Sequence, residues 1–179
     1  KAEPLVWIGK EGEFNDDGTV KTTYPTLHFT TNDSTWGYFP VKTSEFISGG
    51  SQIFETDNYG TDYMKNISGW PHTENENIQI FNESGKMFNE AFTLAKKLGV
   101  KTCAGTETPL IIPQDVKDRL GIKAETDYQI KELYKGMFSR IQKTYPLDYY
   151  WLWTPENWTW NGASDVEVAK TEKDMQLAY

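Results

Sequence analysis

Residues 147–162, with the sequence LDYYWLWTPENWTWNG, constrain the fold more than any other stretch of the chain. From 147 to 153 every residue except Asp148 is apolar or aromatic, a pattern typical of a strand that is buried on both faces. Pro155 ends this strand, because proline has no N–H group to donate to a sheet ladder. Glu156 follows at once, so the sequence predicts a carboxylate at the carboxyl end of a buried strand.

Helices and strands alternate in the second half of the chain. Apolar residues three and four apart, bounded by capping boxes and glycines, predict helices over residues 86–98, 114–120, 127–144 and 165–178. Apolar runs between turn signals predict strands over residues 24–31, 100–105 and 147–153, with a shorter candidate at 4–9. Strands joined by helices pair in parallel, so we expect these three strands to be neighbours in one sheet. The helices at 86–98 and 127–144 are then expected on one side of that sheet.

The region 32–82 shows little helical periodicity and contains several glycines and prolines. A connection of this length within a domain is usually either functional or disordered. Its many aromatic residues argue against disorder. We therefore predict an ordered loop that lies over the carboxyl ends of the strands, within a single domain covering residues 1–179.

Composition excludes several functions. The net charge of −8 disfavours nucleic acid or an anionic membrane as a partner, and no apolar run approaches the ~18 residues of a membrane span. Two histidines and one cysteine disfavour a His/Cys zinc site, so no metal or cofactor is predicted. The single cysteine, Cys103, falls within a predicted strand and is expected to be a small core residue. The aromatic share of 15% fits either a large aromatic core or a surface that faces carbohydrate.

Two glutamates follow predicted strands beside a proline, Glu107 and Glu156. Parallel neighbours would bring both carboxylates to the same rim, and paired carboxylates are what glycoside hydrolysis requires. Indole rings stack on the apolar faces of sugars and create a poorly hydrated setting that suits a general acid. Four tryptophans surround Glu156 in the sequence: Trp151, Trp153, Trp158 and Trp160. Glu156 is therefore the candidate general acid/base, and Glu107 either a second catalytic carboxylate or a substrate-binding residue. The alternative for both is a structural glutamate that binds backbone amides or a nearby cation.

Three further residues are candidates for binding sugar. His28 lies on a predicted strand and either contacts a sugar hydroxyl or has a structural role. Trp36 either forms a stacking platform or packs within its loop. Asn157 either bonds sugar hydroxyls or caps the loop.

Three segments resemble polysaccharide-degrading glycoside hydrolases with a (β/α)8 catalytic barrel, of the agarase and α-glucuronidase kind: WGYFPVKTSEF, LGVKTCAGTETPL and YPLDYYWLWTPENWTWNG. The resemblance covers roughly residues 24–161. It implies that Glu156 is the acid/base at the end of the fourth strand, although Pro155 stands where clan-A enzymes have asparagine. It also implies that the nucleophile, which ends the seventh strand in that clan, lies outside this N-terminal half.

The sequence therefore predicts an α/β fold, a partial (β/α) barrel with parallel strands and a long ordered loop region. Its expected function is that of a secreted or periplasmic glycoside hydrolase acting on a plant or algal poly- or oligosaccharide. The alternatives are a non-catalytic carbohydrate-binding module and an interaction domain whose aromatic residues form the core. Because a half-barrel leaves two sheet edges open, we also expect the remainder of a longer chain or self-association.

Overall fold

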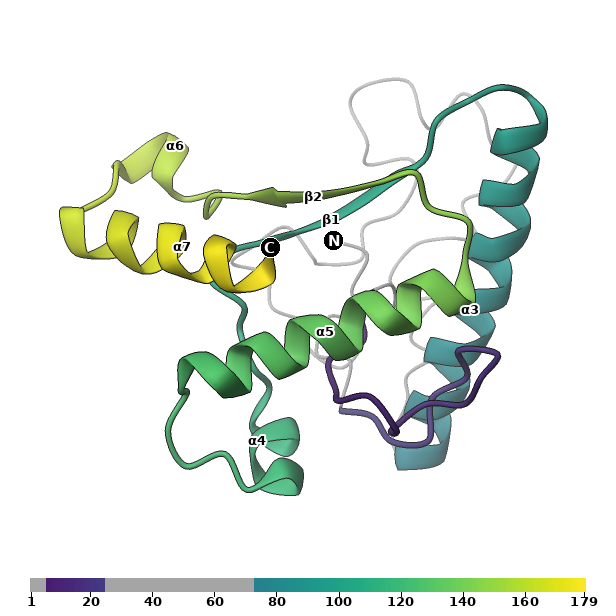
Figure 1. Cartoon of the computed structure of the whole chain (residues 1–179), viewed down its shortest axis with the longest axis horizontal. Helices are drawn as coiled ribbons and strands as arrows, with labels where there is room; N and C mark the ends of the chain where they lie inside the picture. The colour runs from purple at the N-terminus through teal and green to yellow at the C-terminus, as the bar shows by residue number, and fades with distance from the viewer. Residues whose placement is uncertain (1–5, 25–72) are drawn as a thin grey trace, which may run out of the picture. The chain divides into compact units, whose positions relative to one another are not determined.

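The computed structural model describes residues 6–24 and 73–179. The predicted strand at 24–31, most of the predicted loop, and the candidates His28 and Trp36 lie outside these residues. The described part contains the following helices and strands: α3 (Glu74–Lys97), β1 (Cys103–Glu107), α4 (Gln114–Leu120), α5 (Asp127–Thr144), β2 (Tyr149–Trp153), α6 (Trp158–Asn161) and α7 (Asp165–Ala178). Helices combined with a two-stranded parallel sheet make the fold mixed α/β (Figure 1).

The ends of three helices are set by local hydrogen bonds that the sequence predicted. Thr126 caps α5 and Ser164 caps α7, each in a capping box. Gly121 ends α4 at φ 65°, a left-handed conformation that glycine adopts without steric cost. These boundaries confirm the predicted helices at 114–120, 127–144 and 165–178.

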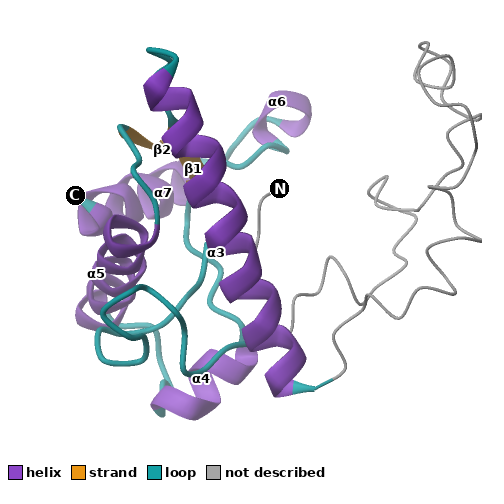
Figure 2. Ribbon diagram, turned by 90° about the vertical axis from the view of Figure 1, so that its right-hand side faces the viewer, coloured by secondary structure: helices purple, strands orange, loops and turns teal. Residues whose placement is uncertain are grey.

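Helix α3 begins at Glu74, so the prediction of a loop up to residue 82 is wrong for its last nine residues (Figure 2). The apolar face was interrupted by polar residues and by Gly85, which obscured the helical spacing. Gly85 is nevertheless buried against α5. A Cβ atom at this position would lie only 2.8 Å from Cγ2 of Thr144, closer than a side chain allows. The absence of a side chain at this position lets α3 and α5 approach closely.

The two strands pair in parallel with Cys103 opposite Tyr149 and Glu107 opposite Trp153, which confirms the predicted pairing of these two strands but does not test the third, at 24–31. Strand β1 starts three residues later than expected. Before it, the carboxylate of Asp148 accepts hydrogen bonds from the backbone N–H and the hydroxyl of Thr102, at 3.0 and 3.2 Å. These bonds align the starts of the two strands.

Strand β2 is buried on one face only, which corrects the prediction that both of its faces are covered. Tyr150 packs against Phe138 of α5 with ring centroids 4.9 Å apart. On the opposite face Tyr149 is 60% exposed and Trp151 is 63% exposed. Cys103 lies opposite Tyr149 and is also exposed, contrary to the expectation of a core residue. The described helices cover only the face that carries Tyr150.

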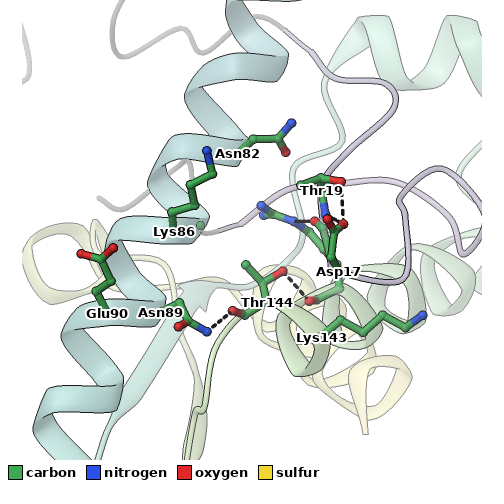
Figure 3. Close-up of a pocket in the computed structure, with 11 residues that line it drawn as sticks. Asp17, Thr19, Asn82, Lys86, Asn89, Glu90, Lys143 and Thr144 are labelled. Atoms are coloured by element: carbon green, nitrogen blue, oxygen red, sulfur yellow. Dashed lines mark hydrogen bonds between the residues drawn. The ribbon is translucent and has the colours of Figure 1, made fainter.

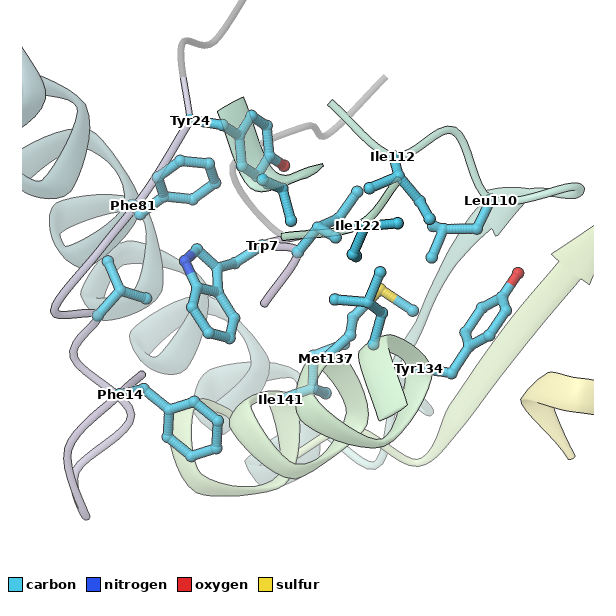
Figure 4. Packing of buried hydrophobic residues seen from close by; sticks show 14 of the residues in the cluster. Trp7, Phe14, Tyr24, Phe81, Leu110, Ile112, Ile122, Tyr134, Met137 and Ile141 are labelled. Carbon is cyan, nitrogen blue, oxygen red and sulfur yellow. The ribbon is translucent and has the colours of Figure 1, made fainter. Parts of the chain in front are cut away.

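The hydrophobic core lies between segment 6–24 and helices α3 and α5 (Figure 4). Trp7 is fully buried there, and its Nε1–H donates to the carbonyl of Thr22 at 2.9 Å. Residues 6–9 do not form the candidate strand; the segment instead contains an antiparallel bridge between Phe14 and Val20.

No helix in residues 6–24 and 73–179 has the length and apolar composition that a membrane span requires.

Candidate functional site

The candidate site lies at the carboxyl ends of β1 and β2, with Glu107 at the end of β1 and Glu156 three residues beyond the end of β2. Glu107 is the last residue of β1, whereas the predicted strand ended two residues before it, and its side chain is half-buried. It pairs in register with Trp153, so the two side chains lie on the same face of the sheet. Thr108 extends the pairing, since its backbone N–H and its hydroxyl donate to the carbonyl of Trp153 at 2.8 and 3.0 Å.

Two indoles form an aromatic surface on this face of the sheet. The rings of Trp151 and Trp153 lie 5.2 Å apart at an interplanar angle of 50°, on one face of β2, as expected for residues two apart in a strand. A Cβ atom at Gly105 would lie 2.8 Å from Cζ3 of Trp153, so the indole occupies the space above this glycine. Gly105 thus allows Trp153 to cross from β2 towards β1. We refer to Tyr149, Trp151 and Trp153 as the exposed aromatic face.

Glu156 is exposed on the turn that leads from β2 into α6. Its backbone carbonyl accepts from Thr159 N–H at 3.2 Å, and the carbonyl of Pro155 accepts from Trp158 N–H at 3.1 Å. The turn therefore holds the backbone of Glu156 while its side chain remains in solvent. We expected a poorly hydrated pocket at Glu156, lined by at least two of the four tryptophans, but in the described part its side chain is exposed.

The other candidates near Glu156 differ in exposure. Trp158 is half-buried, whereas Trp160 is 78% exposed. Asn157 precedes α6 without a capping bond from its side chain, while its backbone carbonyl accepts from Trp160 and Asn161. Trp160 and the side chain of Asn157 are thus both accessible to a ligand.

A buried carboxylate that sequence reasoning missed holds the loop after β1. Asp174 on α7 is only 4% exposed and accepts from the backbone N–H of Leu110 at 3.1 Å and from the hydroxyl of Tyr134. Burial, and next the bond to Asp174, raise the pKa of the Tyr134 phenol, so this hydroxyl stays protonated. The spacing of Thr171, Asp174 and Ala178 on one face of α7 was the available signal.

Residues 6–24 and 73–179 contain no cluster of three or more histidine, cysteine or acidic side chains that would hold a metal ion. The two cavities of about 390 and 400 Å³ in this part of the chain lie away from the strand ends, and neither is lined by Glu107, Glu156 or the four tryptophans. What the strand ends offer is an open surface with two carboxylates and exposed indoles.

No protein-family model, curated protein or solved structure matches the chain.

Proposed function

We propose that this chain is part of the catalytic barrel of a glycoside hydrolase that acts on a poly- or oligosaccharide, with Glu156 as the general acid/base. The exposed aromatic face beside Glu107 is the observation that supports this proposal. Indoles usually become buried during folding, since burial of their large apolar surface stabilises the folded state. Here Trp151 remains 63% exposed on the face of β2 opposite to α5. An exposed indole surface beside the carboxylate of Glu107 suits a sugar ring, which has apolar C–H faces and polar edges.

In the proposed reaction Glu156 donates its proton to the glycosidic oxygen as the bond to the anomeric carbon breaks. The leaving sugar departs as an alcohol. The resulting carboxylate of Glu156 then takes a proton from water as the water oxygen bonds to the anomeric carbon, which completes hydrolysis and restores the acid. Glu107 pairs in register with Trp153 on the neighbouring strand, and its proposed role is to bond sugar hydroxyls. The tryptophans hold the rings on either side of the cleaved bond.

The second candidate is a non-catalytic carbohydrate-binding module that uses the same indoles. The exposure of Glu156 favours this alternative, because a general acid usually sits in a poorly hydrated setting that keeps it protonated near neutral pH. Binding through Trp151 and Trp160 would require no carboxylate in a buried environment.

Oligosaccharides from plant and algal polysaccharides would test both candidates by calorimetric titration and by assay of released reducing ends. We expect Trp151→Ala to weaken binding by about threefold to tenfold, since ring stacking contributes ~0.5–1.5 kcal/mol. Tyr128→Ala is the matched control, because Tyr128 is also exposed but lies on α5. Equal effects of both substitutions, or the absence of binding by any oligosaccharide, would contradict sugar binding at the exposed aromatic face.

Glu156→Gln tests the catalytic role separately from binding. If the chain turns over a bound oligosaccharide, the substitution should lower the rate by about 10²–10⁴ and leave affinity nearly unchanged. Glu172→Gln, an exposed glutamate on α7, should leave turnover intact. Turnover that survives Glu156→Gln would refute the assignment, and sugar binding without turnover would favour the binding module.

A further inference from the structure

A buried arginine without a carboxylate partner lies far from the carboxyl ends of the strands. Arg140 on α5 is 1% exposed; its Nε donates to the carbonyl of Gly18 at 3.0 Å and its Nη2 to the carbonyl of Phe81 at 3.1 Å. Within residues 6–24 and 73–179, its Nη1 has no hydrogen-bond partner and the guanidinium has no carboxylate partner. Arg119, in contrast, bonds the carboxylate of Glu13 at 2.8 Å. A buried cation with only neutral partners is destabilising, and this desolvation lowers the pKa of Arg140.

The guanidinium lies at the border of a cavity of about 390 Å³ between α3, the end of α5 and the turn at 17–19. Figure 3 shows Lys86 and Asn89 on the α3 side of this cavity, and Thr144 and Lys143 on the α5 side. Asn89 donates to the carbonyl of Thr144 at 2.8 Å, which ties the two helices together beside the cavity. The cavity is thus held by fixed elements of the fold.

The two lysines that line the cavity form only exposed ion pairs with carboxylates. Lys86 pairs with Glu83 on its own helix at 2.7 Å, and Lys143 pairs with Asp16 at 3.1 Å. The side chains of Lys86, Glu83 and Asp16 are more than half exposed. That of Lys143 is 42% exposed, and its Nζ also lies 5.7 Å from the centroid of the Phe14 ring. Ion pairs this exposed contribute little and exchange readily. Both ammonium groups can therefore turn towards a ligand, and a concentration of three cations is unusual in a chain of net charge −8.

The other polar groups of the cavity are two carboxylates and the amide of Asn82, and their hydrogen bonds decide whether an anion can bind beside them. The carboxylate of Asp17 already accepts from the N–H and the hydroxyl of Thr19, which lower its pKa. Asn82 accepts from the N–H of Val20 at 2.8 Å, so its amide oxygen is used and its NH₂ group remains available as a donor. Glu90 is the other carboxylate at the cavity and is exposed.

We propose that this cavity binds a small tetrahedral oxyanion, a sulfate or phosphate group that is either free or carried by a sugar. Arg140 supplies positive potential at the cavity border, and Lys86 and Lys143 supply charged donors that close around the anion. The anion would compensate the buried charge that the protein leaves unpaired. The site is separate from the strand ends and does not depend on the proposed glycosidase activity.

The test is calorimetric titration of the intact chain with sodium sulfate and sodium phosphate, against sodium chloride at equal ionic strength. We expect saturable binding of the oxyanions and none of chloride. The double variant Lys86→Gln, Lys143→Gln should weaken binding by at least about tenfold, because it removes two charged donors. Lys135→Gln is the matched control, since Lys135 also lies on α5 and pairs with a carboxylate, Glu11 at 2.8 Å.

A second series separates the two sources of the anion. A sulfated monosaccharide that binds more tightly than inorganic sulfate, while its unsulfated parent does not bind, would assign the site to a charged sugar. Equal affinity for both sulfates would assign it to the free ion. The proposal is overturned if sulfate and phosphate show no more effect than chloride, or if the double variant binds them as well as the Lys135→Gln control does.

Discussion

Replacement of Asp174 by alanine should destabilise the fold strongly for a single substitution. The carboxylate accepts from two buried donors, the N–H of Leu110 and the hydroxyl of Tyr134. Each donor left without a partner costs about 1–3 kcal/mol, which gives about 2–6 kcal/mol for the pair. Alanine is the better helix former and offsets at most about 0.7 kcal/mol. We therefore expect a loss of about 1–5 kcal/mol in the free energy of unfolding.

Urea unfolding followed by circular dichroism measures this loss, with Asp174→Asn and Glu172→Ala as companions. Asparagine keeps an acceptor oxygen for both donors, so Asp174→Asn should recover a large part of the stability. Glu172 is exposed on the same helix, and its replacement should change stability by less than about 0.5 kcal/mol. If Asp174→Ala costs no more than Glu172→Ala does, the two hydrogen bonds do not hold the loop after β1 and the reasoning fails.

Three further substitutions test local features by urea unfolding. Gly105→Ala should lower the free energy of unfolding by about 1–3 kcal/mol, because the new Cβ atom would lie 2.2 Å from the carbonyl oxygen of Trp151. An unchanged urea midpoint would show that β2 can shift to accommodate the methyl group. Ser164→Ala should lower the free energy of unfolding by about 1 kcal/mol, because it removes the capping box of α7. An unchanged free energy of unfolding would mean that packing alone holds this end of the helix. The pKa of Asp148 lies below its ordinary value of 3.8, chiefly through the backbone N–H of Thr102. Because this pKa is lower in the folded state than in the unfolded state, the ionised carboxylate stabilises the fold at pH values above the unfolded-state pKa, and this stabilisation is lost as the pH falls. The difference in free energy of unfolding between wild type and Asp148→Asn should therefore shrink below about pH 4. A difference that does not change with pH would contradict this.

The helix ends were predictable because they depend on interactions within a few residues. A capping box satisfies N–H groups three residues away, and the left-handed conformation at Gly121 concerns one residue. The start of α3 was not predictable in the same way. Its first turns are rich in polar residues, and only burial of Phe81 against the rest of the fold reveals the apolar face.

The burial of β2 depended on information that the strand itself does not contain. A run of apolar residues from 147 to 153 is compatible with burial on both faces, but the elements that pack on the strand decide which faces are covered. Here α5 covers Tyr150, and the face of Trp151 stays open in the described part of the chain. The candidate site owes its accessibility to this one-sided packing.

Arg140 shows how the hydrophobic periodicity of α5 also contained a signal for a second site. It follows Met137 by three residues and precedes Ile141 by one, and all three are buried on the side of the helix that faces the core. A charged residue at a core position requires either a partner or a ligand, and this signal lies far in the sequence from the tryptophans and glutamates of the candidate site. The cavity at Arg140 adjoins the end of α5 before β2 begins, and Glu156 follows the end of β2. The five residues of β2 span about 16 Å at ~3.3 Å each, more than a single anion bridges. An oxyanion in the cavity therefore acts independently of a sugar at the strand ends, and the failure of either proposal would leave the other intact.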